Sequence, residues 1–505
     1  MGQSPPDFLW AQRTGGSGSD VGYSIAADTN GNVFVTGSFS TTNFLGSSNL
    51  ISSGLTDIFI AKHSPSGSLL WARQAGGTGY DEGRGIVADN AGNVYVTGHF
   101  QDTASFGATN LTSSGQSDVF VAKYDPDGNL VWVRRVGGND FDEGHAIALD
   151  TAGNIYLTGT FDKNATFGSA GTLMNNSGTS DIFVAKVDPL GDFVWALKAG
   201  GGEEDNGAGI ALDAFGNVYV TGFFAGTATF ESTNLTSRGG DTMRDGFLAK
   251  YNSNGALIWV QQLGGNNGDE AKAVATDLAG NAVITGSFTL SGLFGTNNLV
   301  GNGKDIFIAR FDGSGNNLWA RQAGGNDAIY GDGGEGISTD PSGNIYATGF
   351  FSGMASFGTN VLTTSGFDDA FVSKCDTNGN VIWVRQAGGN LLDAGYGIAL
   401  AGPERVCVTG FFYGTATFGS TNLISSGFED LFTMELGMVG TPRISIARNG
   451  ANITLSWPVW ASNFVLEAND HLGSETNDWV FVSTSTNEVT LPLSAQRRLF
   501  RLRYP

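Results

Sequence analysis

One tryptophan recurs through most of the chain at a nearly constant interval, and this period constrains the fold more than any other feature. The spacings are 61, 61, 63, 64, 60 and 64 residues, between Trp10, Trp71, Trp132, Trp195, Trp259, Trp319 and Trp383. A Thr-Gly pair recurs with the same period, at Thr36, Thr97, Thr158, Thr221, Thr285, Thr348 and Thr409. An aspartate does so too, at Asp57, Asp118, Asp181, Asp245, Asp305, Asp369 and Asp430. Three independent markers therefore indicate seven copies of one unit.

The stretch Gly83–Gly138 shows what one unit contains. It holds four apolar runs rich in Val, Ile, Tyr and Phe and separated by Gly, Asn and Asp: Ile86–Asp89, Val94–Phe100, Asp118–Tyr124 and Leu130–Val136. Such runs predict strands. Glycine makes up 77 of 505 residues, about twice its ordinary share, as expected for many tight turns. One unit is therefore predicted to be a four-stranded antiparallel sheet.

The phase of the units distinguishes a ring from an open array. The chain begins with a lone fourth strand at Phe8–Thr14, and the units stop after a third strand at Leu431–Leu436. In a ring the first strand completes the last unit, and no edge is left open. We therefore predict an all-β fold, a seven-bladed β-propeller over residues 7–437 with four-stranded blades and an N-terminal strand that closes the last blade.

The repeated unit resembles a known family. The pattern GIALDxxGNVYVTGxF, continued by FGxxNLxSSGxxDIFVAKYDxxGNLxWVRQAGG, is similar to the bacterial SBBP-type β-propeller repeat over roughly residues 7–436. The resemblance implies the propeller fold. It implies little about activity, because the family has no shared catalytic motif and propellers carry many unrelated functions.

After Gly437 the repeat ends, and residues 441–505 are predicted to form a small β-sandwich-like domain. Six strand-like runs occur there: Arg443–Ala447, Ile453–Trp457, Phe464–Ala468, Trp479–Ser483, Glu488–Leu491 and Leu499–Arg503. The segments NFVLEAND, WVFVSTSTNEVTLPL and RRLFRLR resemble the C-terminal β-domain of many secreted planctomycete and verrucomicrobial proteins. A docking role would use an exposed Trp460 or the arginines Arg497, Arg498, Arg501 and Arg503. An ordinary strand explains the alternation of Arg498, Phe500 and Leu502 better.

The overall charge excludes some partners. The net charge is −22 and the isoelectric point is about 4.4, which argues against nucleic acid and anionic membranes and permits cations, basic proteins and neutral glycans. No apolar run approaches the roughly 18 residues of a membrane span. The start, MGQSPPDFLW, lacks the apolar segment of a signal peptide and looks like a mature N-terminus with an added methionine. We therefore expect a secreted or cell-surface protein whose signal peptide was removed.

Two recurring residue types are predicted to serve packing. Cys375 and Cys407 stand where other units have tyrosine, such as Tyr124 and Tyr95, so buried free thiols are expected rather than a disulfide. The recurring tryptophans are expected in the core for the same reason, because they keep one register in every unit.

The short links between strands carry the pattern Asp-x-x-Gly-Asn, as in Asp28–Asn32, Asp89–Asn93 and Asp125–Asn129. Aspartate at a turn start bonds its own backbone, and glycine supplies a positive φ, so hairpin turns are predicted. A calcium loop is the alternative, but the spaced acids and terminal glutamate of such a loop are missing.

The opposite face carries long loops, which we expect to be ordered as small hairpins and to be the better location for a site. An aspartate enters each first strand on this face: Asp20, Asp81, Asp142, Asp205, Asp269, Asp332 and Asp393. Because all seven units keep it, a turn-fixing role as acceptor of backbone N–H groups is favoured. A ring of cation or ligand contacts at the channel mouth is the alternative.

Three residues after each of these aspartates, the units differ. The residues are Tyr23, Arg84, His145, Ala208, Lys272, Glu335 and Tyr396, of which all but Ala208 are candidate ligand-binding residues. Arg84, His145 and Lys272 would meet an anionic group, and Tyr23 and Tyr396 would stack on a sugar or another ring. Ordinary surface variation is the alternative interpretation.

No catalytic motif accompanies these residues. The four histidines form no HExxH spacing, and no GxSxG occurs. The sequence therefore favours a non-enzymatic binding or scaffold protein whose ligand is a glycan or a protein on the loop-rich face. A polysaccharide lyase or glycosidase using the same face is the alternative. No catalytic residue, metal ligand or cofactor is assigned, with calcium as the open alternative, and the oligomeric state is undetermined.

Overall fold

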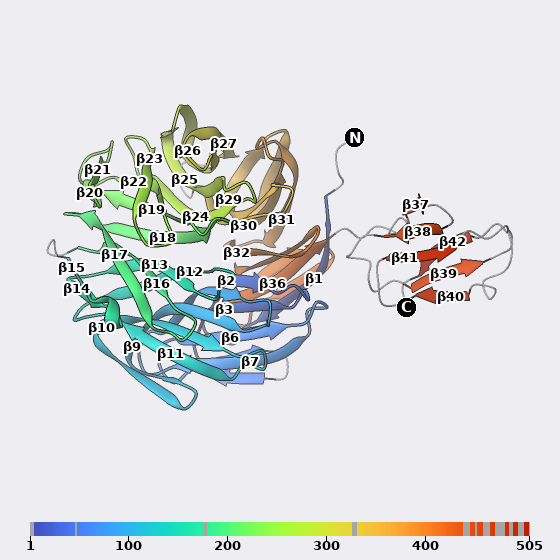
Figure 1. Cartoon of the computed structure of the whole chain (residues 1–505), viewed down its shortest axis with the longest axis horizontal. Helices are drawn as coiled ribbons and strands as arrows, with labels where there is room; N and C mark the ends of the chain where they lie inside the picture. Colours follow the sequence, from blue (N-terminus) through green and yellow to red (C-terminus); the bar gives the residue numbers. More distant parts are fainter. Residues whose placement is uncertain are drawn as a thin grey trace.

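The computed structural model describes residues 5–45, 48–175, 179–325 and 331–437, together with six short stretches in the C-terminal part. Nearly all regular structure in these residues is β-strand, as predicted, and the exception is one 3₁₀ turn, η1 (Gly168–Ala170). Figure 1 shows the strands up to residue 437 arranged around a centre, with the last strands forming a separate group.

Most of the strands described up to residue 437 pair antiparallel in seven groups of four, which we number as blades 1 to 7. Blade 1 consists of β2 (Asp20–Ala27), β3 (Val33–Phe39), β6 (Asp57–His63) and β7 (Leu69–Gly76), and blade 2 of β8 (Glu82–Ala88), β9 (Val94–Phe106), β10 (Thr109–Tyr124) and β11 (Leu130–Val136). Blade 3 consists of β12 (Asp142–Leu149), β13 (Ile155–Phe161), β16 (Asp181–Val187) and β17 (Phe193–Gly201). Blade 4 consists of β18 (Asp205–Leu212), β19 (Val218–Ala225), β22 (Arg244–Tyr251) and β23 (Leu257–Gly264). Blade 5 consists of β24 (Glu270–Thr276), β25 (Ala282–Phe294), β26 (Asn297–Phe311) and β27 (Asn317–Gly325). Blade 6 consists of β28 (Gly333–Thr339), β29 (Ile345–Phe357), β30 (Asn360–Cys375) and β31 (Val381–Gly389). Blade 7 consists of β32 (Asp393–Gly402), β33 (Arg405–Phe412), β36 (Asp430–Gly437) and β1 (Asp7–Thr14).

The first strands of the blades lie side by side around a central channel. Each contacts the first strand of the next blade, in the order β2, β8, β12, β18, β24, β28 and β32, and β32 contacts β2 again. The N-terminal strand closes the ring as predicted, because β1 pairs antiparallel with β36 from Asp7↔Gly437 to Thr14↔Leu431. An ion pair between Arg13 and Asp430 reinforces this pairing.

The long loops form hairpins, as expected. Separate short hairpins are β4 (Thr42–Leu45) with β5 (Ser48–Ile51), β14 (Asn164–Thr166) with β15 (Thr172–Met174), β20 (Thr227–Phe230) with β21 (Thr233–Thr236), and β34 (Thr415–Phe418) with β35 (Thr421–Ile424). In blades 2, 5 and 6 the second and third strands run on into the hairpin, so the predicted start of the third strand at Asp118 was too late. The predicted start of the first strand at Ile86 was also wrong, because the glycine-rich residues from Glu82 onward pair with β9 although they are not apolar.

The recurring tryptophan joins neighbouring blades as well as packing within them. In blade 1, the indole Nε1 of Trp71 donates to the carbonyl of Pro126 in blade 2 at 2.9 Å. Gly128 of the same turn packs directly against the Trp71 ring, because a Cβ atom added at Gly128 would lie 2.8 Å from a ring carbon. Both cysteines are buried free thiols, as predicted.

The described residues of the C-terminal part form six strands close to the predicted runs. They form two three-stranded sheets, one of β37 (Ser445–Asn449), β38 (Asn452–Ser456) and β41 (Glu488–Pro492), the other of β40 (Val480–Ser483), β39 (Val465–Asn469) and β42 (Leu499–Arg503). Leu455, Trp457 and Leu466 form a small buried cluster there. Trp460, Arg497 and Arg498 lie outside the described residues. The domain boundary between 437 and 441 and the resemblance of this part to secreted β-domains stay predictions.

A glycine substitution tests the contact between blades. Gly128→Ala places a methyl group against Trp71 and a non-glycine residue at φ +78°, whereas Gly107→Ala changes a turn at φ +61° with nothing within 4 Å. We expect Gly107→Ala to lower the free energy of unfolding by about 1 kcal/mol and Gly128→Ala by roughly 2 kcal/mol more. Denaturant titration of both variants measures the difference. Equal losses would contradict the packing of this turn on the tryptophan.

Candidate functional site

Each innermost strand contains a β-bulge at the same place. In blade 1 the pairing of β2 with β3 shifts between Gly22 and Ser24, so Tyr23 has no residue opposite it. The corresponding bulge residues of the seven blades are Tyr23, Arg84, His145, Ala208, Lys272, Glu335 and Tyr396. A bulge changes the direction of one side chain. These bulge residues are the positions at which the repeated units differ.

The bulge residues line one cavity in the channel. The cavity has a volume of about 430 Å³, and Asn206 and Phe350 complete its lining. This size is within the range of small-ligand sites. The structure therefore brings all six predicted residues and Ala208 together, and the binding of a ligand by them stays a prediction.

The aromatic residues of this cavity contact one another. The rings of Tyr23 and Tyr396 are stacked, with centroids 5.9 Å apart and planes 22° apart. The guanidinium of Arg84 lies 4.0 Å from the Tyr23 centroid, and Phe411 lies 5.6 Å from Tyr396. The two tyrosines thus form one fixed aromatic wall rather than two separate platforms for a sugar.

The basic residues are already paired within the protein, and their expected contact with an anionic group stays a prediction. Each binds a glutamate two residues earlier on its own strand: Arg84 to Glu82 at 2.5 Å, His145 to Glu143 at 3.2 Å and Lys272 to Glu270 at 2.7 Å. The sequence contained a signal for this. The residue after the entering aspartate is acidic only in the three blades whose bulge residue is basic.

Two of these pairs keep their glutamates ionised. The hydrogen bond from His145 lowers the pKa of Glu143 to about 2. Burial opposes ionisation of Glu270, but Lys272 and Arg244 hold its pKa at about 2. His145 also makes a hydrogen bond through Nδ1 to the carbonyl oxygen of Gly207 in the next blade, at 3.1 Å. The charged side of the cavity is therefore held rigidly before any ligand arrives.

Glu335 differs from the other charged residues of the cavity. Among the described residues, no hydrogen bond or ion pair reaches its carboxylate. Burial raises its pKa, although the charges of Lys272 and Lys304 act in the opposite direction. It stands beside Tyr396 and Phe350 in the cavity lining. Glu335 is thus an acceptor available to a ligand.

The seven entering aspartates fix turns, as favoured from the sequence. They are at most 2% exposed, so they do not open into the channel. Asp142, for example, accepts the N–H of Gly138 at 2.7 Å. Gly137 lies between the side chains of Asp142 and of Asp118, which belongs to the preceding blade. A Cβ atom at Gly137 would clash with both. Burial and the charge of Asp118 raise the pKa of Asp142 to about 8.

The Asp-x-x-Gly-Asn links form hairpin turns. In the first of them, Oδ1 of Asp28 accepts the N–H groups of Asn30 and Asn32 at 2.9 Å, and Oδ2 accepts the Asn32 side-chain amide at 2.7 Å. Within the described residues, no three His, Cys, Asp or Glu side chains lie close enough together to hold a metal ion.

Comparison with protein families identifies the repeat. Three stretches match the SBBP β-propeller repeat, at residues 9–44, 70–99 and 131–160. Together with the strand pairing, this match shows that the chain carries SBBP-type β-propeller repeats, and such a fold supports a binding or scaffold role.

Two curated proteins resemble this chain over part of their own length, and both are much longer than this chain. An uncharacterized WD repeat-containing protein of Acanthamoeba polyphaga mimivirus is 24% identical over 495 residues, covering 79% of this chain and 36% of that protein. The regulatory protein FlaEY of Caulobacter vibrioides is 27% identical over 209 residues, covering 40% of this chain and 22% of that protein. The chain thus spans about a third or less of these relatives.

Solved structures show only distant likeness. A puromycin hydrolase is 11% identical with a TM-score of 0.43, covering 91% of this chain and 61% of that chain. A gluconolactonase of Xanthomonas campestris is 10% identical with a TM-score of 0.34, covering 86% and 95%. These values say nothing about activity.

Among the described residues, no helix has the length and apolar character needed to cross a membrane.

The buried aspartates make stability depend on pH in a defined direction. The pKa of Asp142 rises from about 4 in the unfolded chain to about 8 in the fold, as does that of Asp205, so the folded state binds more protons across this range. We expect the Tm to fall as the pH rises from 5.5 to 8.5. The Asp142→Asn variant should lose part of this dependence, whereas Asp125→Asn, in an exposed turn, should keep it. A Tm that rises with pH would contradict this assignment.

Proposed function

We propose that this protein is a non-enzymatic binding protein that holds part of a glycan in the channel cavity of the bulge residues, approached from the loop-rich face. The observation that carries the proposal is the lining of one 430 Å³ cavity by the residues at which the units differ. Residues that differ among otherwise uniform blades are free of the demands of the scaffold. Their convergence on one cavity provides a place where selection for a ligand can act.

The chemistry of the cavity favours a neutral, hydroxyl-rich ligand. Arg84, His145 and Lys272 are neutralised by glutamates on their own strands, so a ligand charge is not needed to balance them. The stacked wall of Tyr23 and Tyr396 offers apolar contact beside these polar groups. Sugars present both apolar C–H faces and hydroxyl groups, and a rigid site of this kind binds them with little loss of side-chain freedom.

The rim of the same face favours a macromolecular ligand over a free metabolite. Large apolar side chains are exposed in the loops where the first and third strands begin: Leu55, Tyr80, Phe141 and Phe428. Such side chains offer contact area around the cavity for the rest of a chain whose end enters it. Placement of the protein outside the cell, secreted or on the surface, is part of this proposal.

The pairing of the basic residues also favours binding over turnover. A lyase or glycosidase needs an acid and a base that face the bond to be broken. Here His145 is engaged by Glu143 and Gly207, and Lys272 by Glu270. The alternative of a carbohydrate-active enzyme therefore has less support than the binding role.

Glycan-array binding with three variants tests the proposal. Tyr396→Ala removes half of the aromatic wall, and Glu335→Gln removes the charge of the unpaired acceptor. Each should weaken binding about tenfold or more, because a buried contact is lost. Phe215→Ala removes an aromatic ring that is 73% exposed in a turn at the opposite end of the first strands, and should bind as the wild type does.

Three results would contradict the proposal. The first is a glycan that binds with equal affinity to all three variants. The second is an empty array combined with capture of a protein partner that Tyr396→Ala abolishes, which would make the ligand a protein. The third is turnover of a polysaccharide that depends on His145 or Lys272.

A further inference from the structure

Four blades share an arrangement in which two donors from one blade bind one oxygen of the next. The donors are a lysine or arginine near the end of the third strand and the recurring tryptophan of the fourth. The oxygen is a main-chain carbonyl in the turn between the third and fourth strands of the following blade. The sets are Lys62 and Trp71 with Pro126, Lys186 and Trp195 with Ser253, Lys250 and Trp259 with Gly313, and Arg310 and Trp319 with Thr377.

Among the described residues, blade 6 has the two donors without the oxygen. Lys374 and Trp383 stand at the corresponding positions, but the next blade is closed from β36 and β1, so no turn connects its third and fourth strands. In blade 2 the next blade does supply a turn, but among the described residues neither Lys123 nor Trp132 bonds to it, and the buried Nε1 of Trp132 has no hydrogen-bond partner. Only the donors of blade 6 face a blade that lacks this turn.

The two donors of blade 6 are buried. Lys374 and Trp383 are each 4% exposed, and within the described residues neither has a hydrogen bond or an ion pair. The ammonium of Lys374 lies 5.1 Å from the centroid of Tyr346, a contact that leaves its N–H groups available. A cation that borders a cavity without an acceptor of its own favours an oxygen at this place.

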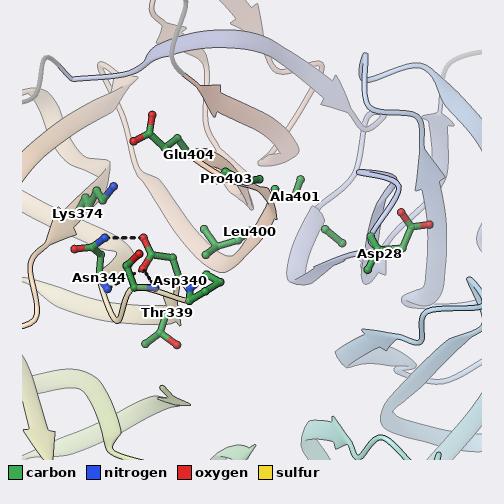
Figure 2. A pocket seen from close by; sticks show the side chains of 14 residues that line it. Asp28, Thr339, Asp340, Asn344, Lys374, Leu400, Ala401, Pro403 and Glu404 are labelled. Atoms are coloured by element: carbon green, nitrogen blue, oxygen red, sulfur yellow. Dashed lines mark hydrogen bonds between the residues drawn. The ribbon is translucent and has the colours of Figure 1, made fainter. Parts of the chain in front are cut away.

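Lys374 borders a second cavity, at the short-turn end of the first strands. Its volume is about 980 Å³, and its walls come from blades 6, 7 and 1 (Figure 2). Part of the wall is the turn Ala401–Glu404 of blade 7, which replaces the Asp-x-x-Gly-Asn turn found in the other blades. The wall includes the apolar Leu400 and Pro403. None of its residues belongs to the cavity of the bulge residues.

We propose that this second cavity binds an organic monocarboxylate, with a carboxylate oxygen on Lys374 in the place that a main-chain carbonyl occupies in four other blades. A single negative charge fits best, because Lys374 is the one cation among the described lining residues, whereas three acids, Asp28, Asp340 and Glu404, also border the cavity. A more highly charged anion would be repelled by these acids and by a net charge of −22. Leu400 and Pro403 provide apolar contact for a short alkyl body.

Butyrate and its uncharged analogue butyramide are the probes. We expect butyrate to raise the Tm of the full-length protein and to shift the indole N–H resonance of Trp383, whereas butyramide should do much less. Lys374→Met should weaken butyrate binding at least tenfold, because a charge-assisted hydrogen bond is lost. Lys374→Arg should retain binding, which separates loss of the cation from loss of the fold.

Lys62→Met is the matched control, because Lys62 has its own acceptor in Pro126 and lies outside the cavity. It should bind butyrate as the wild type does. The proposal is wrong if butyramide binds as well as butyrate, if Lys374→Met binds butyrate unchanged, or if phosphate binds more tightly than butyrate. A crystal structure with a main-chain carbonyl of this chain on Lys374 would also overturn it.

Discussion

The pairing of β1 with β36 is the interaction on which the rest of the structure depends. It joins residues from the two ends of the repeats, from Asp7↔Gly437 to Thr14↔Leu431, and gives the last blade its fourth strand. Only a closed ring brings β32 next to β2 and makes the first strands surround a channel. The stack of Tyr396 on Tyr23 crosses this closure, so the aromatic wall of the candidate site exists only when the ring is shut.

The sequence predicted the fold well because the repeats specify it several times over. A four-stranded unit, its phase and its closure all follow from the positions of a few recurring residues. The bulge in each first strand was missed, since Gly83, Arg84 and Gly85 show no apolar alternation and a bulge is defined by the strand opposite. The early start of these strands was missed for the same reason.

The candidate site was predicted in part. Residues that differ between units were expected to be free for function, and the bulges gather them in one cavity. The glutamates that neutralise the basic residues were not foreseen, although Glu82, Glu143 and Glu270 accompany Arg84, His145 and Lys272 in the sequence. The donors of blade 6 were harder to find. Lys374 stands at a position that is basic in most of the repeated units, so the sequence does not single it out. What distinguishes it is that the next blade has no turn between its third and fourth strands to supply a carbonyl oxygen.

The position of the closure within a blade has a consequence for how such a chain can change during evolution. Gain or loss of one whole unit between blades 2 and 6 leaves the lone fourth strand and the incomplete last unit unchanged, so β1 can still pair with β36. The number of first strands around the channel would change, and with it the channel width. Recombination between repeats can therefore resize the channel cavity in a single step, while substitutions at the bulges adjust its chemistry one residue at a time.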